Sequence, residues 1–316
     1  MMKKINDIIG DAKTIGIAGH VRPDGDCMGS CMSLYNYLKK NRPDLDVRVF
    51  LEFVDKKFNI IENTDQIITT GYDGTKFDLF ISLDTASLDR LGLNLPFYEN
   101  AKRTACIDHH ASNDGYADYN YILPKASSAS EVLYDLLDED LIDKSIAEPM
   151  YMGIAHDSGV FRFQSTTPKT MRIAANMIEK GVNVNMILEE TFFRKTYNQM
   201  MVTAKIQSEA VLVLDGKCIY GYCTSEMMEE YGVTTKDLDA VVASIRNVDG
   251  VEVAMFLYQL SEDSYKVSLR SKNYVDVSKI AVENGGGGHV RAAGAEIHGK
   301  LNDIINKLLN RIKQDI

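Results

Sequence analysis

The segment Asp78–Asp84, DLFISLD, decides the fold class of this chain of 316 residues. Four of the five residues between its two aspartates are apolar, and such a run is typical of a strand buried on both faces of a sheet. Similar runs occupy residues 14–19, 47–51 and 103–107, and helical patterns fill residues 28–40 and much of 128–180. This alternation predicts an α/β fold with a mostly parallel sheet flanked by helices.

The pattern changes near residue 185. Residues 185–210 read as helical and contain no glycine or proline, which predicts a connecting helix. Beyond it we expect strands over 210–214, 217–223, 251–260 and 265–270, and helices over 234–246, 276–283 and 301–313. The sequence therefore predicts a first domain over residues 1–190, a linker helix over 191–209 and a smaller α/β domain over 210–316.

The composition is that of an average soluble globular protein, and we expect this protein to be cytoplasmic. Hydrophobic residues make up 45% of the chain and charged residues 25%, and no apolar run approaches the roughly 18 residues of a membrane span. The N-terminus reaches Asp7 too soon for a signal peptide, and the five cysteines, which form no CxxC pair, are expected to be reduced. A formal net charge of -10 without a basic stripe argues against a grip on long duplex nucleic acid.

Carboxylates and histidines follow the predicted strands at the points where these strands end. His20 follows the first strand, Asp84 the third and Asp108 the fourth. Open α/β sheets bind ligands in the crevice beyond the carboxyl ends of their strands. We therefore expect residues that are far apart in the sequence to converge at this edge of the sheet.

These residues belong to four short motifs rich in metal ligands. The motifs are His20-x-x-x-Asp24-x-Asp26, Asp84-Thr85-Ala86-Ser87, Asp108-His109-His110, and Asp157 within the segment GIAHDSGVF at residues 153–161. Carboxylate oxygens combined with imidazole suit Mn²⁺ or a similar divalent ion, and there are about enough groups for two ions. A two-metal centre is the usual machinery for attacking a phosphate ester.

Each motif also has a structural interpretation. Asp26 or Asp84 could cap a helix, the paired histidines could lie in a solvated loop, and Asp157 could close a turn. We expect His156 to be an ordinary surface residue, although it could instead orient the site.

A glycine-rich run, GGGGHVRAAG at residues 285–294, stands out in the second domain. Glycines let backbone N–H groups approach phosphate oxygens, and His289 and Arg291 could add hydrogen bonds and charge. Ser268 and Arg270 are two residues apart in a predicted strand, so they share one face, and Arg270 can bind phosphate through both arms of its guanidinium. A flexible structural loop is the alternative.

Together these motifs resemble those of the DHH phosphoesterase family, over nearly the whole chain. HxxxDxD at residues 20–26, DTA at 84–86, DHH at 108–110 and DSG at 157–159 match in order, and GGGHxxAAG at 286–294 is similar to the signature of the DHH-associated C-terminal domain. Ser158 stands where many members have threonine.

The resemblance implies a role for each matching residue. One Mn²⁺ would be held by His20, Asp24 and Asp84, and the other by Asp26, Asp84, His109 and Asp157, so that Asp84 bridges the two. His110 would face the scissile phosphate and act with Asp84 in catalysis. Substrate phosphate would be bound from the second domain by Arg270, Ser271, Gly286, Gly287, Gly288 and His289.

Within the family, the short two-domain form implies an Mn-dependent exonuclease that degrades very short RNA to mononucleotides and converts pAp (adenosine 3′,5′-bisphosphate) to AMP. Its partners would then be short single-stranded RNA, dinucleotides or pAp, with no membrane and no long duplex. A soluble phosphodiesterase for cyclic dinucleotides or pApA is the main alternative. A nucleotide-sensing module that binds without cutting is the non-enzymatic one, and a homodimer is possible.

Overall fold

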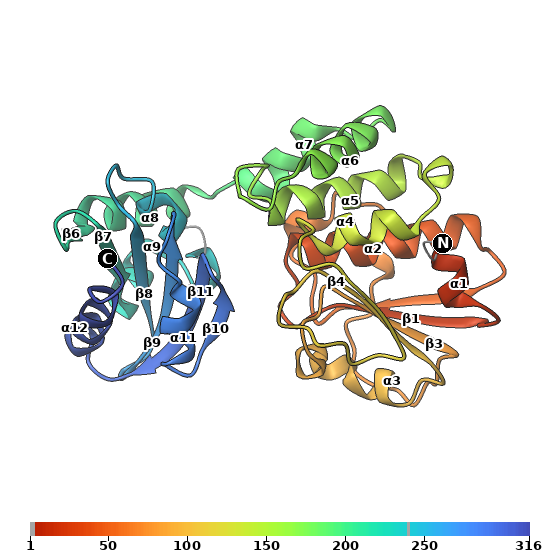
Figure 1. The fold of residues 1–316 in the computed structure, drawn as a ribbon, viewed down its shortest axis with the longest axis horizontal. Coiled ribbons are helices and arrows are strands. Elements are labelled where there is room, and N and C mark those ends of the chain that lie inside the picture. Colours follow the sequence, from red (N-terminus) through yellow and green to blue (C-terminus); the bar gives the residue numbers. More distant parts are fainter. Residues whose placement is uncertain (1–3, 239–240) are drawn as a thin grey trace. The chain divides into compact units, whose positions relative to one another are not determined.

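A computed structural model describes residues 4–238 and 241–316 of the chain. The chain divides into two compact units, Met1–Arg194 and Lys195–Ile316 (Figure 1). Each unit has its own sheet and its own hydrophobic core. Within the described ranges, no helix has the length and hydropathy that crossing a membrane requires.

The sheet of the first unit is entirely parallel, with its strands in the order β2-β1-β3-β4-β5. The strands are β1 (Thr14–Ala18), β2 (Asp46–Phe50), β3 (Leu79–Leu83), β4 (Thr104–Asp108) and β5 (Tyr119–Ile122). The predicted fold class is therefore confirmed. The sequence pattern does not predict β5, because this short and partly exposed edge strand depends on its pairing with β4, where Cys106 lies opposite Asn120.

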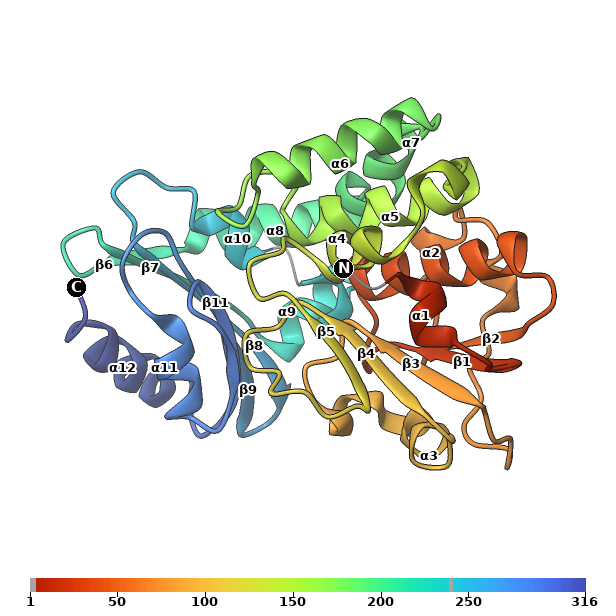
Figure 2. The same ribbon diagram turned by 45° about the vertical axis from the view of Figure 1, so that its right-hand side comes forward.

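Helices cover both faces of this sheet (Figure 2). The helices of this unit are α1 (Ile5–Ile9), α2 (Gly25–Asn41), α3 (Leu95–Glu99), α4 (Ala129–Leu136), α5 (Lys144–Asp157), α6 (Pro168–Glu179) and α7 (Val184–Leu188). Of these, α6 packs on α4 and α5, and α7 packs on α5. Helices α2, α4 and α5 pack on one face through the main aliphatic core, and α3 covers a cluster of phenylalanines on the other face. Short 3₁₀ turns lie at Lys56–Phe58, Thr64–Gln66, Leu88–Asn94 and Glu139–Leu141.

Helices α2 and α5 approach each other closely where both carry glycine. A Cβ atom on Gly29 would lie 2.4 Å from the carbonyl oxygen of Pro149 and 2.8 Å from the backbone nitrogen of Gly153, so no larger residue fits. This packing matters for the site, because Asp26 lies in the first turn of α2 and Asp157 is the last residue of α5.

The second unit has a mixed sheet in the order β10-β11-β9-β8-β7-β6. Its strands are β6 (Val211–Val213), β7 (Cys218–Cys223), β8 (Val253–Ser261), β9 (Ser264–Ser271), β10 (Gly287–His289) and β11 (Ala292–His298). The glycine-rich run is thus part of a hairpin, β10–β11, and not a free loop. Glycine disfavours strands, so this hairpin is not predictable from local sequence and depends on the pairing of β11 with β9.

Helices also cover the second sheet. They are α8 (Tyr197–Glu209), α9 (Ser225–Tyr231), α10 (Val241–Ile245), α11 (Val277–Val282) and α12 (Leu301–Ile312), with a 3₁₀ turn at Thr235–Asp237. One core joins α11 and α12 to the sheet, and a second core joins α8 and α10 to β7 and β8. The helix predicted over 234–246 is only partly present, as the 3₁₀ turn and α10, and residues 239–240 lie outside the described ranges.

The predicted linker helix over 191–209 differs from the structure, which contains no single helix across this range. A π-helical turn, Glu189–Phe193, is followed by non-helical residues 194–196 and then by α8. The break falls where Thr196 caps α8 and forms a capping box with Gln199. Val202 and Ile206 of α8 are buried in a core of the second unit, so α8 is part of that unit.

Candidate metal centre

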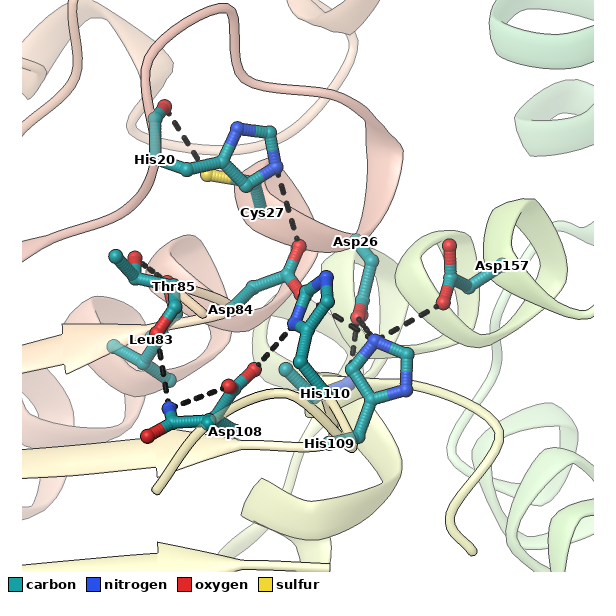
Figure 3. Close-up of polar contacts among 12 residues, drawn as sticks. His20, Asp26, Cys27, Leu83, Asp84, Thr85, Asp108, His109, His110 and Asp157 are labelled. Carbon is teal, nitrogen blue, oxygen red and sulfur yellow. Dashed lines mark hydrogen bonds and ion pairs between the residues drawn. The ribbon is translucent and has the colours of Figure 1, made fainter. Parts of the chain in front are cut away.

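The predicted ligands of the first unit converge beyond the carboxyl ends of its strands (Figure 3). His20 follows β1, Asp84 follows β3 and His109 follows β4. Asp26 enters from the first turn of α2 and Asp157 from the end of α5. The topology therefore brings these five residues to one place, as the strand-end rule for parallel sheets predicts.

Asp84 lies at the centre of this group. Its Oδ2 atom is 3.5 Å from His20 Nε2, and its Oδ1 atom is 3.5 Å from His109 Nε2 and 3.7 Å from His110 Nδ1. The residue is 3% exposed, and its φ of 52° lies in the left-handed region that non-glycine residues rarely adopt. Strain of this kind persists only where the surrounding structure imposes it, and here it aims a buried carboxylate at three imidazoles.

Donors stand on both sides of Asp84. On one side, Asp24 Oδ1 lies 3.8 Å from His20 Nε2. On the other side, His109 Nε2 lies 3.2 Å from Asp157 Oδ2 and 3.9 Å from Asp26 Oδ2. Two sets of oxygen and nitrogen donors therefore share Asp84, an arrangement that could hold two divalent ions.

The electrostatics of the centre also fit a bound cation. Burial, and next the charge of Asp84, raise the pKa of Asp26 to about 7. Burial opposes a charged His109, but Asp84, Asp157 and Asp26 outweigh it and raise the pKa of this imidazole to about 10. In the described parts of the chain, these carboxylates form ion pairs with histidines only. A divalent cation bound among these oxygen and imidazole donors would balance the negative charge of the carboxylates.

Asp24 has a second task, as the N-cap of α2. Its carboxylate accepts hydrogen bonds from the backbone N–H groups of Asp26 and Cys27, both at 3.1 Å. The alternative in which Asp26 caps this helix is therefore wrong, because Asp26 is already inside α2. Capping fixes the start of the helix and with it the direction in which Asp26 points.

Asp108 does not face the other carboxylates but holds His110. Its Oδ1 atom is 2.8 Å from His110 Nδ1, and its Oδ2 atom accepts a hydrogen bond of 2.7 Å from the side-chain amide of Asn113. Asn113 also donates to the carbonyl oxygen of Thr85, the residue after Asp84. Sequence reasoning missed Asn113, because only the folded loop after β4 reveals its partners.

His156 corrects the prediction of an ordinary surface residue. Its Nε2 atom is 2.9 Å from Thr191 Oγ1, and its ring packs edge-to-face against Phe192. A Cβ atom on Gly25, between Asp24 and Asp26 in the sequence, would lie 2.1 Å from this ring, so the glycine is required by the contact. Burial, and next the charge of Lys57, lower the pKa of His156 to about 4.

Two of the predicted phosphate-binding residues of the second unit, Arg270 and His289, lie in one row across its sheet. Arg270 of β9 is opposite Ala292 of β11, which is opposite His289 of β10. Residues paired directly in antiparallel strands share a face, so the guanidinium and the imidazole stand on the same face with an alanine between them. Ser271 is the next residue along β9 and lies buried on the opposite face, so it does not join this row.

The glycines at the start of the hairpin differ in whether a side chain would fit in their place. A Cβ atom would lie 2.2 Å from the Gly294 carbonyl oxygen if placed on Gly286, and 2.5 Å from the Ala292 carbonyl oxygen if placed on Gly288. Among the residues that the structure describes, none comes within 4 Å of a Cβ placed on Gly287. The close approach of the β11 backbone therefore explains why residues 286 and 288 are glycines, whereas the space next to Gly287 is open.

Arg291 stabilises the loop after β9. Its Nη1 atom donates to the carbonyl oxygen of Val275 at 2.8 Å, and its Nη2 atom donates to that of Asn273. A longer contact of 3.5 Å joins Nη1 to Ser271 Oγ. The arginine therefore has a structural task in addition to its charge.

Known proteins are similar to this chain over nearly its whole length. Residues 14–154 match the DHH family, N-terminal domain, and residues 215–314 match the DHHA1 domain. The chain is 31% identical over 313 residues to the bifunctional oligoribonuclease and PAP phosphatase NrnA of Thermus thermophilus, covering 96% of this chain and 90% of that protein. It is 28% identical over 290 residues to the protein of the same name from Bacillus subtilis, covering 90% of each.

A solved structure supports the fold. The crystal structure of an exopolyphosphatase-related protein from Bacteroides fragilis matches with a TM-score of 0.89 at 23% sequence identity. The match covers 98% of this chain and 95% of that chain.

Proposed function

The chain belongs to the DHH family and is a hydrolase of phosphoester bonds, and we propose that it degrades short oligoribonucleotides to mononucleotides and converts pAp to AMP. The observation that carries this proposal is the convergence of three imidazoles on the single buried carboxylate of Asp84. Relatives named as oligoribonuclease and PAP phosphatase, which align over most of both chains, support the choice of substrates.

DHH phosphoesterases depend on metal, and the donor set of this chain fits two divalent ions, which we propose to be Mn²⁺. His20, Asp24 and Asp84 would hold one ion. The second would be held by Asp26, Asp84, His109 and Asp157. A pair of divalent ions supplies positive charge that polarises a phosphoryl oxygen and lowers the pKa of water from 15.7 to about 7.

His110 is suited to contact the substrate phosphate next to these ligands. Asp108 holds its Nδ1 atom, and Asn113 holds Asp108 in turn. With Nδ1–H donated to Asp108, the imidazolium form of His110 would donate its Nε2–H to a phosphoryl oxygen. Such a donor stabilises the charge that develops on the oxygen in the transition state.

In the second unit, Arg270, His289 and the backbone around Gly287 would bind a substrate phosphate. Arg270 and His289 share a face of the sheet, and the open space over Gly287 lets an anion approach its backbone. The row is short, and the chain has a net charge of -10. Both properties favour a short substrate over a long duplex.

A turnover panel with Mn²⁺ tests this proposal. The substrates are pAp, pApA, di- to pentaribonucleotides, a longer RNA, a cyclic dinucleotide and pyrophosphate. We expect the highest kcat/KM for pAp and the shortest RNAs. Preference for the cyclic dinucleotide or for pApA would replace our choice with the alternative phosphodiesterase, and binding of nucleotides without turnover would contradict a hydrolase.

A further inference from the structure

Asp26 is the most enclosed of the candidate ligands, with an exposed fraction of 0%. Its carboxylate faces His109 on one side, at 3.9 Å. On the other side it meets the first residues of α4, which come from a part of the chain about a hundred residues away. The direction of this carboxylate is therefore set by α4 as well as by α2.

Three hydrogen bonds join α4 to Asp26. The backbone N–H of Ala129 donates to Oδ2 at 2.6 Å, and the backbone N–H of Ser130 donates to Oδ1 at 3.0 Å. The hydroxyl of Ser130 adds a third bond to Oδ1, at 2.6 Å. Both carboxylate oxygens thus accept hydrogen bonds from α4, and the side of the carboxylate that faces His109 is left to bind a metal ion.

Helix α5 closes the remaining side of this pair. A Cβ atom on Gly153 would lie 2.0 Å from Ser130 Oγ and 2.7 Å from Asp26 Oδ1. Gly153 is therefore a glycine because the hydroxyl and the carboxylate occupy the space in which its side chain would lie.

We propose that Ser130 is a positioning residue of the metal centre, whose hydroxyl holds Asp26 in the orientation that ligates a divalent ion. This inference rests on the proposed role of Asp26 as a ligand. Groups that hydrogen-bond to a ligand fix its geometry, and their loss typically weakens metal binding by about 10–100-fold. Because two backbone N–H bonds to Asp26 remain without the hydroxyl, the expected loss is at the lower end, about tenfold.

A second serine near the start of α4, Ser127, provides a matched control for Ser130. The hydroxyl of Ser127 donates to Oε2 of the buried carboxylate of Glu131, also at 2.6 Å. Ser127 and Ser130 are both 0–1% exposed, and each donates to one buried acid. The Glu131 carboxylate also accepts from the backbone N–H of Ser127, contacts Thr170 and Lys169, and is not part of the metal centre. Removing either hydroxyl has a similar structural cost, but only one of them touches a candidate ligand.

The test measures Mn²⁺ binding to metal-free wild type, Ser130→Ala and Ser127→Ala, by following the electron paramagnetic resonance signal of free Mn²⁺. Thermal unfolding in EDTA shows whether the two variants are equally folded. We expect one of two Mn²⁺ ions to bind about tenfold more weakly in Ser130→Ala, with binding unchanged in Ser127→Ala. Activity of Ser130→Ala should recover at high Mn²⁺, which a misfolded protein would not do.

Each other outcome has a definite meaning. Wild-type affinity in Ser130→Ala, or an equal loss in both variants, overturns the positioning role while the metal centre stands. Wild-type protein that binds no Mn²⁺ removes the proposed centre, and the role of Ser130 falls with it.

Discussion

The two units place their functional side chains in different ways. In the first unit, the parallel sheet gathers residues from separate loops at its strand ends. There the carboxylate of Asp84 lies 3.5 Å from the imidazole of His20 and 3.5 Å from that of His109. In the second unit, Arg270 and His289 stand on the face of antiparallel strands, and their spacing follows from register. A strand-end crevice can surround a cation with donors, whereas a sheet face presents a flat row to an anion.

This contrast predicts that Asp84 cannot be replaced. Asp84→Asn keeps the shape of the side chain but removes the charge that three imidazoles face, so we expect turnover to fall by at least about a thousandfold. Mn²⁺ should bind more weakly, as measured by equilibrium dialysis. A variant that keeps full Mn²⁺ occupancy and full rate would refute the bridging role of this carboxylate.

A smaller loss is expected at His110, which faces the same crevice without a predicted role as a metal ligand. His110→Gln should lower kcat by about a hundredfold or more because it removes a donor to the developing phosphate charge. Metal content, measured by atomic absorption, should stay at the wild-type level. Loss of metal in this variant would assign His110 to the ligands instead.

The sheet face of the second unit should respond differently. His289→Ala is expected to lower kcat/KM for pAp by about ten- to a hundredfold, through a weakened phosphate contact, and to leave Mn²⁺ content unchanged. Val290→Ala is a matched control in the same hairpin turn. If His289→Ala lost metal, the division of labour between the two units would be wrong.

The mildest effect concerns pH. In the metal-free protein, the carboxylates around His109 raise its pKa to about 10, and burial and Asp84 raise that of Asp26 to about 7. At neutral pH the site therefore holds protons that a metal must displace, so the apparent Mn²⁺ affinity should rise between about pH 6 and pH 9. Calorimetry in buffers of different ionisation enthalpy would measure the released protons. An affinity that is independent of pH would contradict this.

The sequence predicts the first unit better than the second for a physical reason. Buried parallel strands are continuous apolar runs, and the strand-end rule then places His20, Asp84 and His109 without further information. The hairpin that carries His289 contains too many glycines to read as a strand, and it forms through the pairing of β10 with β11 and of β11 with β9.

Residues that position other site residues could not be predicted from the sequence. Ser130 and Asn113 contact Asp26 and Asp108 through hydrogen bonds that exist only once the loops and helices have folded. His156 reads as a surface residue because its partners, Gly25 and Thr191, come from distant segments. Long-range partners of this kind leave no periodicity in the sequence.

The central claim is that strand-end carboxylates and imidazoles of the first unit surround two divalent cations bridged by Asp84. The most direct test is a crystal structure of the protein with Mn²⁺, with data collected at the manganese absorption edge. We predict two anomalous peaks, one beside His20 and Asp24 and one beside Asp26, His109 and Asp157, with Asp84 between them. A single peak, or peaks away from Asp84, would contradict the account.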